Sequence, residues 1–253
     1  MNSLVVSFVL LAVSVGGLFL GVYLRSMLPD PHLNSDAKDA VKMGTGLVAA
    51  VTGLVLGLLT ASAKSSYDTQ RANLQQVSAN IVMLDRSLRH FGPEAADARD
   101  LLHAMVASLI DHLWPANSYQ PAGLDNPEIT THSISILEAI RTLPAKTESQ
   151  QAIKAQALQI SMELGRSRWQ LHRWEDSSIP VPFLFVLNFW LAFLFFSFGL
   201  FTPRNATVLG VLSVCAVSVA GALFLVVELD QPFAGLIRIS SAPIKNALTL
   251  IEK

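Results

Sequence analysis

Charged residues are scarce in this chain. Asp, Glu, Lys and Arg make up 15% of its 253 residues, whereas soluble domains contain about 25%. Hydrophobic residues make up 51%, and the mean hydropathy is +0.45. The formal net charge of −1 gives the chain no basic excess with which to bind nucleic acid. This composition argues against a nucleic-acid-binding protein and favours a membrane protein.

Residues that carry chemistry are also few. The only cysteine, Cys215, lies in an apolar run, which excludes a disulfide framework and a C-x-x-C pair. The six histidines never adopt H-E-x-x-H or another ligand spacing. The sequence contains no P-loop, no G-x-G-x-x-G fingerprint and no G-x-S-x-G elbow. We therefore predict no metal site, no cofactor, no catalytic residues and no enzymatic activity.

Four uncharged runs have the length that a helix needs to cross a hydrocarbon core about 30 Å thick. They predict membrane spans over residues 4–24, 44–63, 181–201 and 206–227. The first run is not typical of a cleavable signal peptide, because no basic residue precedes it and no A-x-A-like site follows it. The predicted fold is an all-α membrane protein with two membrane hairpins, over residues 1–63 and 179–227.

The segment 64–178, between the second and third spans, is predicted to be a helical domain. From Tyr67 to Phe91 the apolar residues alternate steps of three and four, a heptad pattern. Because no Gly or Pro separates this stretch from the second span, one helix is expected to continue out of the membrane. Further helices are predicted over about 94–113, 128–143 and 147–176, and residues 228–253 form a tail with a short amphipathic helix. The heptad stripes indicate a bundle core within one chain or, alternatively, packing between subunits.

Basic residues near the spans predict the orientation, because positive loops remain on the cytoplasmic side. With four spans, both termini share a side with the central segment. That side has eight basic residues close to spans and the other side has four. The eight are Lys64, Arg71, Arg166, Arg168, Arg173, Arg238, Lys245 and Lys253, and the four are Arg25, Lys38, Lys42 and Arg204. We expect both termini to be cytoplasmic.

The second span carries two contrasting stripes. Small residues on one face favour close helix packing, and the glycines of this face are Gly46, Gly53 and Gly57. The other stripe combines hydroxyls with bulky apolar residues and consists of Thr45, Ala49, Thr52, Leu56 and Leu59. We predict that this second stripe lines a pore, with an apolar constriction at Leu56 and Leu59. The alternative is a lipid-facing stripe whose threonines bond to their own helix.

The end of the fourth span places two carboxylates in an unfavourable position. Glu228 and Asp230 lie at a helix C-terminus, where the helix dipole disfavours anions, and Pro232 follows. A compensating partner is expected, either Arg238, a basic residue such as Arg173, or a bound cation. The alternative is an interfacial cap that faces solvent.

Two stretches carry a resemblance to a known family. E-L-D-Q-P-F-A-G-L-I-R-I-S at 228–240, together with G-L-V-A-A-V-T-G-L-V-L-G-L-L at 46–59, resembles the bacterial bestrophin-like family and, distantly, the bestrophin anion channels. The resemblance covers most of the chain. It implies that the family signature consists of Glu228, Asp230, Pro232, Phe233 and Gly235. It also implies a homo-oligomer, expected to be a pentamer, with four membrane helices per subunit and a pore lined by the second.

The sequence departs from the bestrophin pattern in two respects. The second span contains no Phe, and the acidic run that binds calcium in animal relatives is reduced to Glu228 and Asp230. The leading hypothesis is a homo-oligomeric ion channel or channel-like protein for small inorganic ions, and the ions that it is expected to conduct are anions. Its partners are membrane lipid and other copies of the chain. The alternatives are a non-conducting scaffold or sensor whose helical domain binds a partner, and a stator-like energy-coupling subunit.

Overall fold

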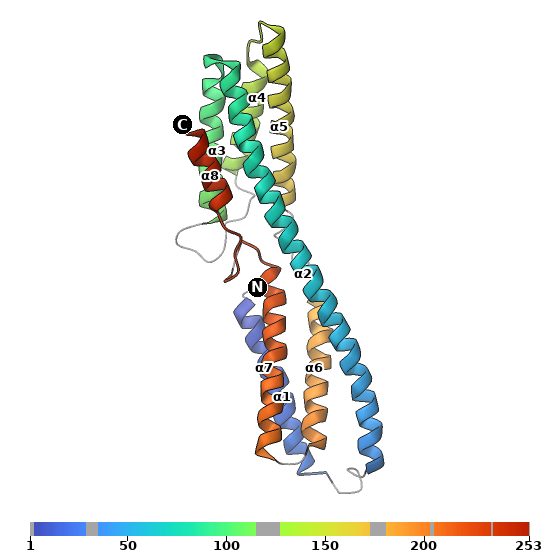
Figure 1. The fold of residues 1–253 in the computed structure, drawn as a ribbon. Coiled ribbons are helices and arrows are strands. Elements are labelled where there is room, and N and C mark those ends of the chain that lie inside the picture. Colours follow the sequence, from blue (N-terminus) through green and yellow to red (C-terminus); the bar gives the residue numbers. More distant parts are fainter. Residues whose placement is uncertain are drawn as a thin grey trace. The chain divides into compact units, whose positions relative to one another are not determined.

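The structure is a computed structural model that describes residues 3–28, 35–114, 127–172, 181–202, 205–233 and 235–252. Figure 1 shows that the described residues form helices joined by short connections, and none of them lies in a strand. The helices are α1 (Ser3–Arg25), α2 (Ser35–Phe91), the 3-10 helix η2 (Pro93–Ala95), α3 (Ala96–Leu113), α4 (Pro127–Thr142), α5 (Glu148–His172), α6 (Val181–Phe201), α7 (Ala206–Leu229) and α8 (Ala242–Ile251).

Four helices of the described chain are long and apolar enough to cross a membrane. They are α1, α6, α7 and a segment of α2. The predicted class, an all-α membrane protein with a helical domain between its second and third membrane helices, is confirmed. Contacts between residues divide the chain into two compact units. We call residues 1–66 with 178–230 the membrane unit, and residues 67–177 with 231–253 the bundle unit.

The helix α2 is unbroken from Ser35 to Phe91. The prediction that the second span continues into the heptad stretch is therefore confirmed, although the helix begins nine residues before the expected start at 44. The helix ends where the sequence predicts a stop, because Gly92 has a φ of 123° and Pro93 begins η2. A positive φ of this kind is readily adopted only by glycine.

The core of the bundle unit is built from the heptad stripes. On α2, the buried apolar residues that belong to it are Leu74, Val77, Ile81, Leu84, Leu88 and Phe91. The helices α3, α4, α5 and α8 contribute buried residues to the same cluster, including Leu102, Ile140, Ile160 and Ile244. The heptad stripes therefore pack inside one chain, as the first of the two sequence interpretations proposed.

In the membrane unit, α1 packs against α6 and α7. Three glycines make the α1 and α6 backbones approach closely, because small residues remove the steric barrier between helices. A Cβ atom built on Gly17 would lie 2.9 Å from the carbonyl oxygen of Ala192. One built on Gly21 would overlap the carbonyl oxygen of Phe196, and one on Gly199 would overlap that of Leu18. Among the described glycines, the tightest packing is thus between the first and third spans, whereas the sequence indicated close packing for the second.

Candidate functional site

The stripe of α2 that the sequence assigns to a pore is largely covered within the subunit. Thr45 and Thr52 have exposed fractions of 6% and 4%. Their hydroxyls donate to backbone carbonyls one turn earlier in the same helix, at 2.9 Å and 2.7 Å. Leu56 and Leu59 pack against buried residues of the neighbouring membrane helices, namely Leu10, Leu187, Leu191, Leu223 and Val226. Of the expected lining residues, only Ala49 is exposed.

The glycines of α2 lie on a face that no other described helix covers. A Cβ atom built on Gly46, Gly53 or Gly57 would meet nothing within 4 Å. Beside these glycines, bulky side chains are also exposed, with fractions of 68% for Leu47, 65% for Leu54 and 63% for Leu58. We name Gly46, Gly53 and Gly57 the small stripe, and Leu47, Leu54 and Leu58 the leucine stripe. Lipid or a second copy of the chain can reach these two stripes.

The contacts of α2 thus differ from the arrangement that its sequence suggested. The sequence separates a small face from a bulky face, but it does not state which one the other helices of the subunit cover. In the structure the face with Thr45, Thr52, Leu56 and Leu59 packs toward the rest of the membrane unit, and the small stripe faces away from it. The threonine hydroxyls bond to their own helix, as the alternative interpretation expected.

The acidic end of α7 is buried. Glu228 has no exposed surface and Asp230 is 9% exposed. The helix ends at Leu229, and the backbone N–H of Asp230 still donates to the carbonyl of Val226 at 3.2 Å. A solvent-facing cap, one of the sequence interpretations, is therefore wrong for these carboxylates.

A short loop follows the two carboxylates. The N–H of Ile239 donates to the carbonyl of Pro232 at 2.8 Å, and the Nε of Arg238 donates to the carbonyl of Gly235 at 2.8 Å. Gly235 has a φ of 78°, which favours glycine at this position. The described contacts therefore give Arg238 a role in holding its own loop. Arg173, the other basic residue that the sequence suggested as a partner, lies outside the described residues.

Trp114, at the end of α3, anchors this loop to the bundle unit. Its indole N–H donates to the carbonyl of Ile239 at 2.9 Å, and its ring meets Phe233 edge to face at a centroid distance of 5.8 Å. Phe233 is itself 7% exposed. The sequence predicts only that a helix ends just before this residue, at about 113. Because the partner is a backbone carbonyl 125 residues away, no local pattern indicates the contact.

Replacing Trp114 with Phe should lower the melting temperature (Tm) of the purified protein by a few degrees. The variant keeps an aromatic ring against Phe233 but leaves the carbonyl of Ile239 without its donor, which costs about 1–3 kcal/mol. Trp114→Ala also removes the ring and should cost about 3–5 kcal/mol. Thermal unfolding in detergent compares the three proteins. A Trp114→Phe variant with the wild-type Tm would show that the hydrogen bond adds no stability.

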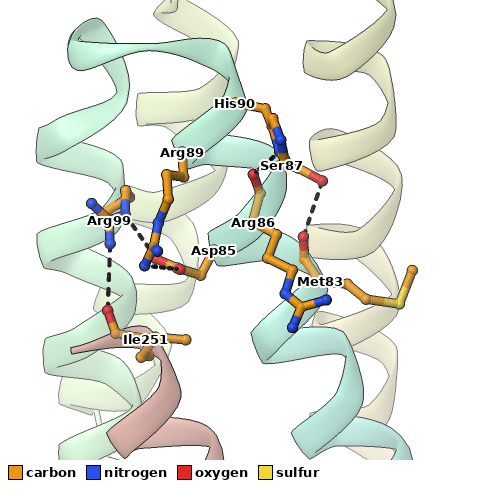
Figure 2. A network of polar contacts seen from close by, with 8 residues as sticks. All are labelled: Met83, Asp85, Arg86, Ser87, Arg89, His90, Arg99 and Ile251. Atoms are coloured by element: carbon orange, nitrogen blue, oxygen red, sulfur yellow. Dashed lines mark hydrogen bonds and ion pairs between the residues drawn. The ribbon is translucent and has the colours of Figure 1, made fainter. Parts of the chain in front are cut away.

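A second polar cluster joins three elements of the bundle unit. Figure 2 shows Asp85 of α2 between two arginines. The Nη2 of Arg89 lies 3.1 Å from its Oδ2, and the Nε of Arg99 lies 2.8 Å from its Oδ1. The Nη2 of Arg99 also donates to the carbonyl of Ile251, near the end of α8, at 3.4 Å. The Asp85 side chain is 2% exposed, so a buried carboxylate at the centre of this cluster connects α2, α3 and α8. The sequence offered one signal for it, the i,i+4 spacing of Asp85 and Arg89.

Neither the acidic end of α7 nor the Asp85 cluster is a metal centre by this measure, since no three His, Cys, Asp or Glu side chains converge in the described part of the chain. The features that stand out for function are therefore the open face of α2 and the loop that follows α7.

Comparisons with known proteins bear on this site. A family model described as a Bestrophin-like domain matches residues 8–244. The fold is similar to a crystal structure of a bacterial bestrophin homologue from Klebsiella pneumoniae with a point mutation, at 14% identity and a TM-score of 0.70, covering 97% of each chain. A second point mutant of that homologue matches at 14% identity and a TM-score of 0.68, covering 99% of this chain and 98% of the other. A structure described as a membrane protein matches at 15% identity and a TM-score of 0.70, covering 96% of each chain. No curated protein matches the sequence.

Proposed function

Because this chain belongs to the bestrophin-like family, we propose that it forms a homo-oligomeric channel for small anions, with the membrane segment of α2 nearest the axis. The observation that carries the proposal is the two-sided character of that segment. The other membrane helices cover the face that carries Thr45, Thr52, Leu56 and Leu59. By contrast, a Cβ atom on the small stripe would meet nothing within 4 Å, and the leucine stripe is 63% to 68% exposed. In a ring of subunits, such an open face meets a neighbouring copy or the pore.

The two open stripes suit two different roles. The leucine stripe forms an apolar constriction, because rings of bulky apolar side chains control conduction by excluding water. The small stripe allows α2 of a neighbouring subunit to approach closely. Thr45, Thr52, Leu56 and Leu59 support the pore from behind. Ala49 is two residues from Leu47, about 200° around the helix, so it does not line the same face as the leucine stripe. This proposal transfers the constriction from Leu56 and Leu59 to Leu47, Leu54 and Leu58.

The charges along α2 favour anions over cations. No Asp or Glu lies between Asp39 and Asp68, so the apolar part of the helix offers no carboxylate to a cation. The same part is flanked by Lys42 and Lys64, both exposed. Repeated around an axis, these residues place basic rings at both ends of the pore, and such rings attract anions.

Leu54→Ala and Leu56→Ala form a matched pair that tests this assignment. Leu54→Ala should change chloride flux through liposomes several-fold, because it widens the constriction while removing a side chain that is 65% exposed. Leu56→Ala should leave the flux per folded protein within about twofold but lower the Tm, because it opens a cavity in the packing of the subunit, at a cost of up to about 2–5 kcal/mol. If Leu56→Ala alters flux and Leu54→Ala does not, the lining face is the one first expected from the sequence.

We further place both termini and the bundle unit on the cytoplasmic side of a bacterial inner membrane, since eight basic residues adjoin the spans on that side and four on the other. In a Cys215→Ser background, a cysteine at the exposed position Gln151 should resist an impermeant maleimide in intact spheroplasts and react after lysis. Labelling of this cysteine in intact spheroplasts would show that the orientation is the opposite one.

A further inference from the structure

An open groove runs between α2 and α5 on the bundle unit. It has a volume of about 530 Å³, and its lining includes Met83, Arg86 and His90 from α2 with Ile153 and Gln156 from α5. None of the lining residues is acidic. Figure 2 shows Arg86 turned away from the Asp85 cluster, and no carboxylate among the described residues forms an ion pair with it. The groove is therefore basic at its rim and partly apolar along its walls.

The outer face of α3 has the opposite character. Five exposed residues recur there in alternating steps of three and four, which places them on one side of the helix. We name this set the acidic ridge; it consists of Asp97, Asp100, Ala104, Ala107 and Asp111. No described basic side chain lies within ion-pair distance of its three aspartates. Because its central members are alanines, the ridge is narrow enough to approach another helix pair closely.

The ridge and the groove of one copy cannot meet each other. Figure 1 shows α3 and α5 at opposite edges of the bundle unit, and α4 contacts both of them. The two surfaces nevertheless occupy the same length of the bundle. The helices α2 and α3 are antiparallel about Gly92, so that His90 and Asp97 lie near the turn, and Met83 and Ala104 lie about two turns further from it. Copies related by rotation about an axis along these helices would present the two surfaces at the same level.

We propose that the groove of one copy receives the acidic ridge of the next. Asp97 and Asp100 meet the basic rim at Arg86 and His90, while Ala104 and Ala107 contact Met83 and Ile153. The contact is heterologous, since each copy uses two different surfaces. Such a contact closes into a ring when the rotation that relates one copy to the next is a whole-number fraction of 360°. This inference rests on the proposed function, because it supplies the subunit contact that the proposed channel needs outside the membrane.

Cysteine crosslinking of the full-length protein in detergent tests the contact directly. In a Cys215→Ser background, Met83→Cys combined with Ala104→Cys should give a covalent ladder from dimer upward after treatment with a short bifunctional maleimide. Either substitution alone leaves no reactive partner on the neighbouring copy and should stop the ladder. Met83→Cys combined with Glu138→Cys, at an exposed position on α4, is the matched control and should give no ladder.

Charge reversal tests the same contact without crosslinking. Arg86→Glu and Asp100→Arg should each lower the ratio of multimer to monomer by about tenfold in native mass spectrometry, because each places like charges together. Combining the two should restore the ratio, whereas Glu138→Lys should change it less than about twofold. High salt should weaken the wild-type contact, since both partners are exposed.

The outcomes separate this contact from the channel itself. A conducting wild-type multimer that forms no ladder, and whose mass neither reversal changes, would overturn the contact but leave the channel in place. A monomeric wild-type protein without flux would overturn both. If Arg86→Glu abolishes binding of added inorganic phosphate but leaves the multimer intact, the groove is a site for a small anion and the contact is wrong.

Discussion

Replacing Gly21 with alanine is expected to prevent α1 and α6 from reaching their packing distance. The added Cβ would overlap the carbonyl oxygen of Phe196 and lie 2.8 Å from the backbone nitrogen of Leu200. Because both neighbours are backbone atoms of a helix, no side chain can rotate to make room. Overpacking typically costs about 1–3 kcal/mol, and a backbone clash belongs at or above the upper end of that range. We expect Gly21→Ala to lose most of the monodisperse protein recovered in detergent, and Gly199→Ala, which meets Leu18, to do the same.

Gly16→Ala is the matched control on the same helix. A Cβ atom at this position would meet nothing within 4 Å. Alanine is also the better helix former by about 1 kcal/mol, so that Gly16→Ala should be as stable as the wild type or more so. Size-exclusion profiles and Tm values of the three variants measure the difference. Equal behaviour of Gly16→Ala and Gly21→Ala would show that α1 and α6 are not packed as closely as the structure describes.

The second large effect is expected at Asp85. Replacing it with alanine leaves the guanidinium groups of Arg89 and Arg99 without their carboxylate, and Arg99 is the more buried of the two, with 28% of its side chain exposed. Removing one partner of a buried pair costs about 3–5 kcal/mol, and the partial exposure of both arginines reduces the expected loss to about 2–3 kcal/mol. The Tm should fall, and amide exchange in α8 should accelerate, since Arg99 also binds the carbonyl of Ile251.

Arg89→Ala provides the comparison for Asp85→Ala. Its side chain is 46% exposed and makes one ion pair within α2, so its loss should cost less than about 1 kcal/mol. The stability lost in Arg99→Ala should lie between the losses in Arg89→Ala and Asp85→Ala, and amide exchange in α8 should accelerate. If Arg89→Ala and Asp85→Ala destabilise the protein equally, the cluster acts as a local helix pair and not as a connection among α2, α3 and α8.

The sequence predicted the elements of this fold well because their signals are local. Uncharged runs of span length and apolar residues at heptad spacing depend only on neighbours along the chain. The stop at Gly92 and Pro93 is local in the same way, since it follows from what two adjacent residues can adopt. The family resemblance carried by 46–59 and 228–240 agrees with the family model over 8–244.

The covered and open faces of the membrane helices were harder to predict because they depend on contacts between distant segments. Gly53 and Gly57 have the same spacing as Gly17 and Gly21, yet only the latter pair meets another backbone. Leu54 and Leu56 are chemically identical, and their different exposure is determined by where α1, α6 and α7 lie. The contact of Trp114 with Ile239 similarly requires the tertiary fold.

Chloride flux from liposomes that contain the purified full-length protein tests the central claim most directly. We predict chloride release faster than from protein-free liposomes, carried by a multimer and changed several-fold by Leu54→Ala. No flux of chloride or of any cation, from a protein whose native mass is that of a monomer or dimer, would contradict the proposal that this chain is a channel.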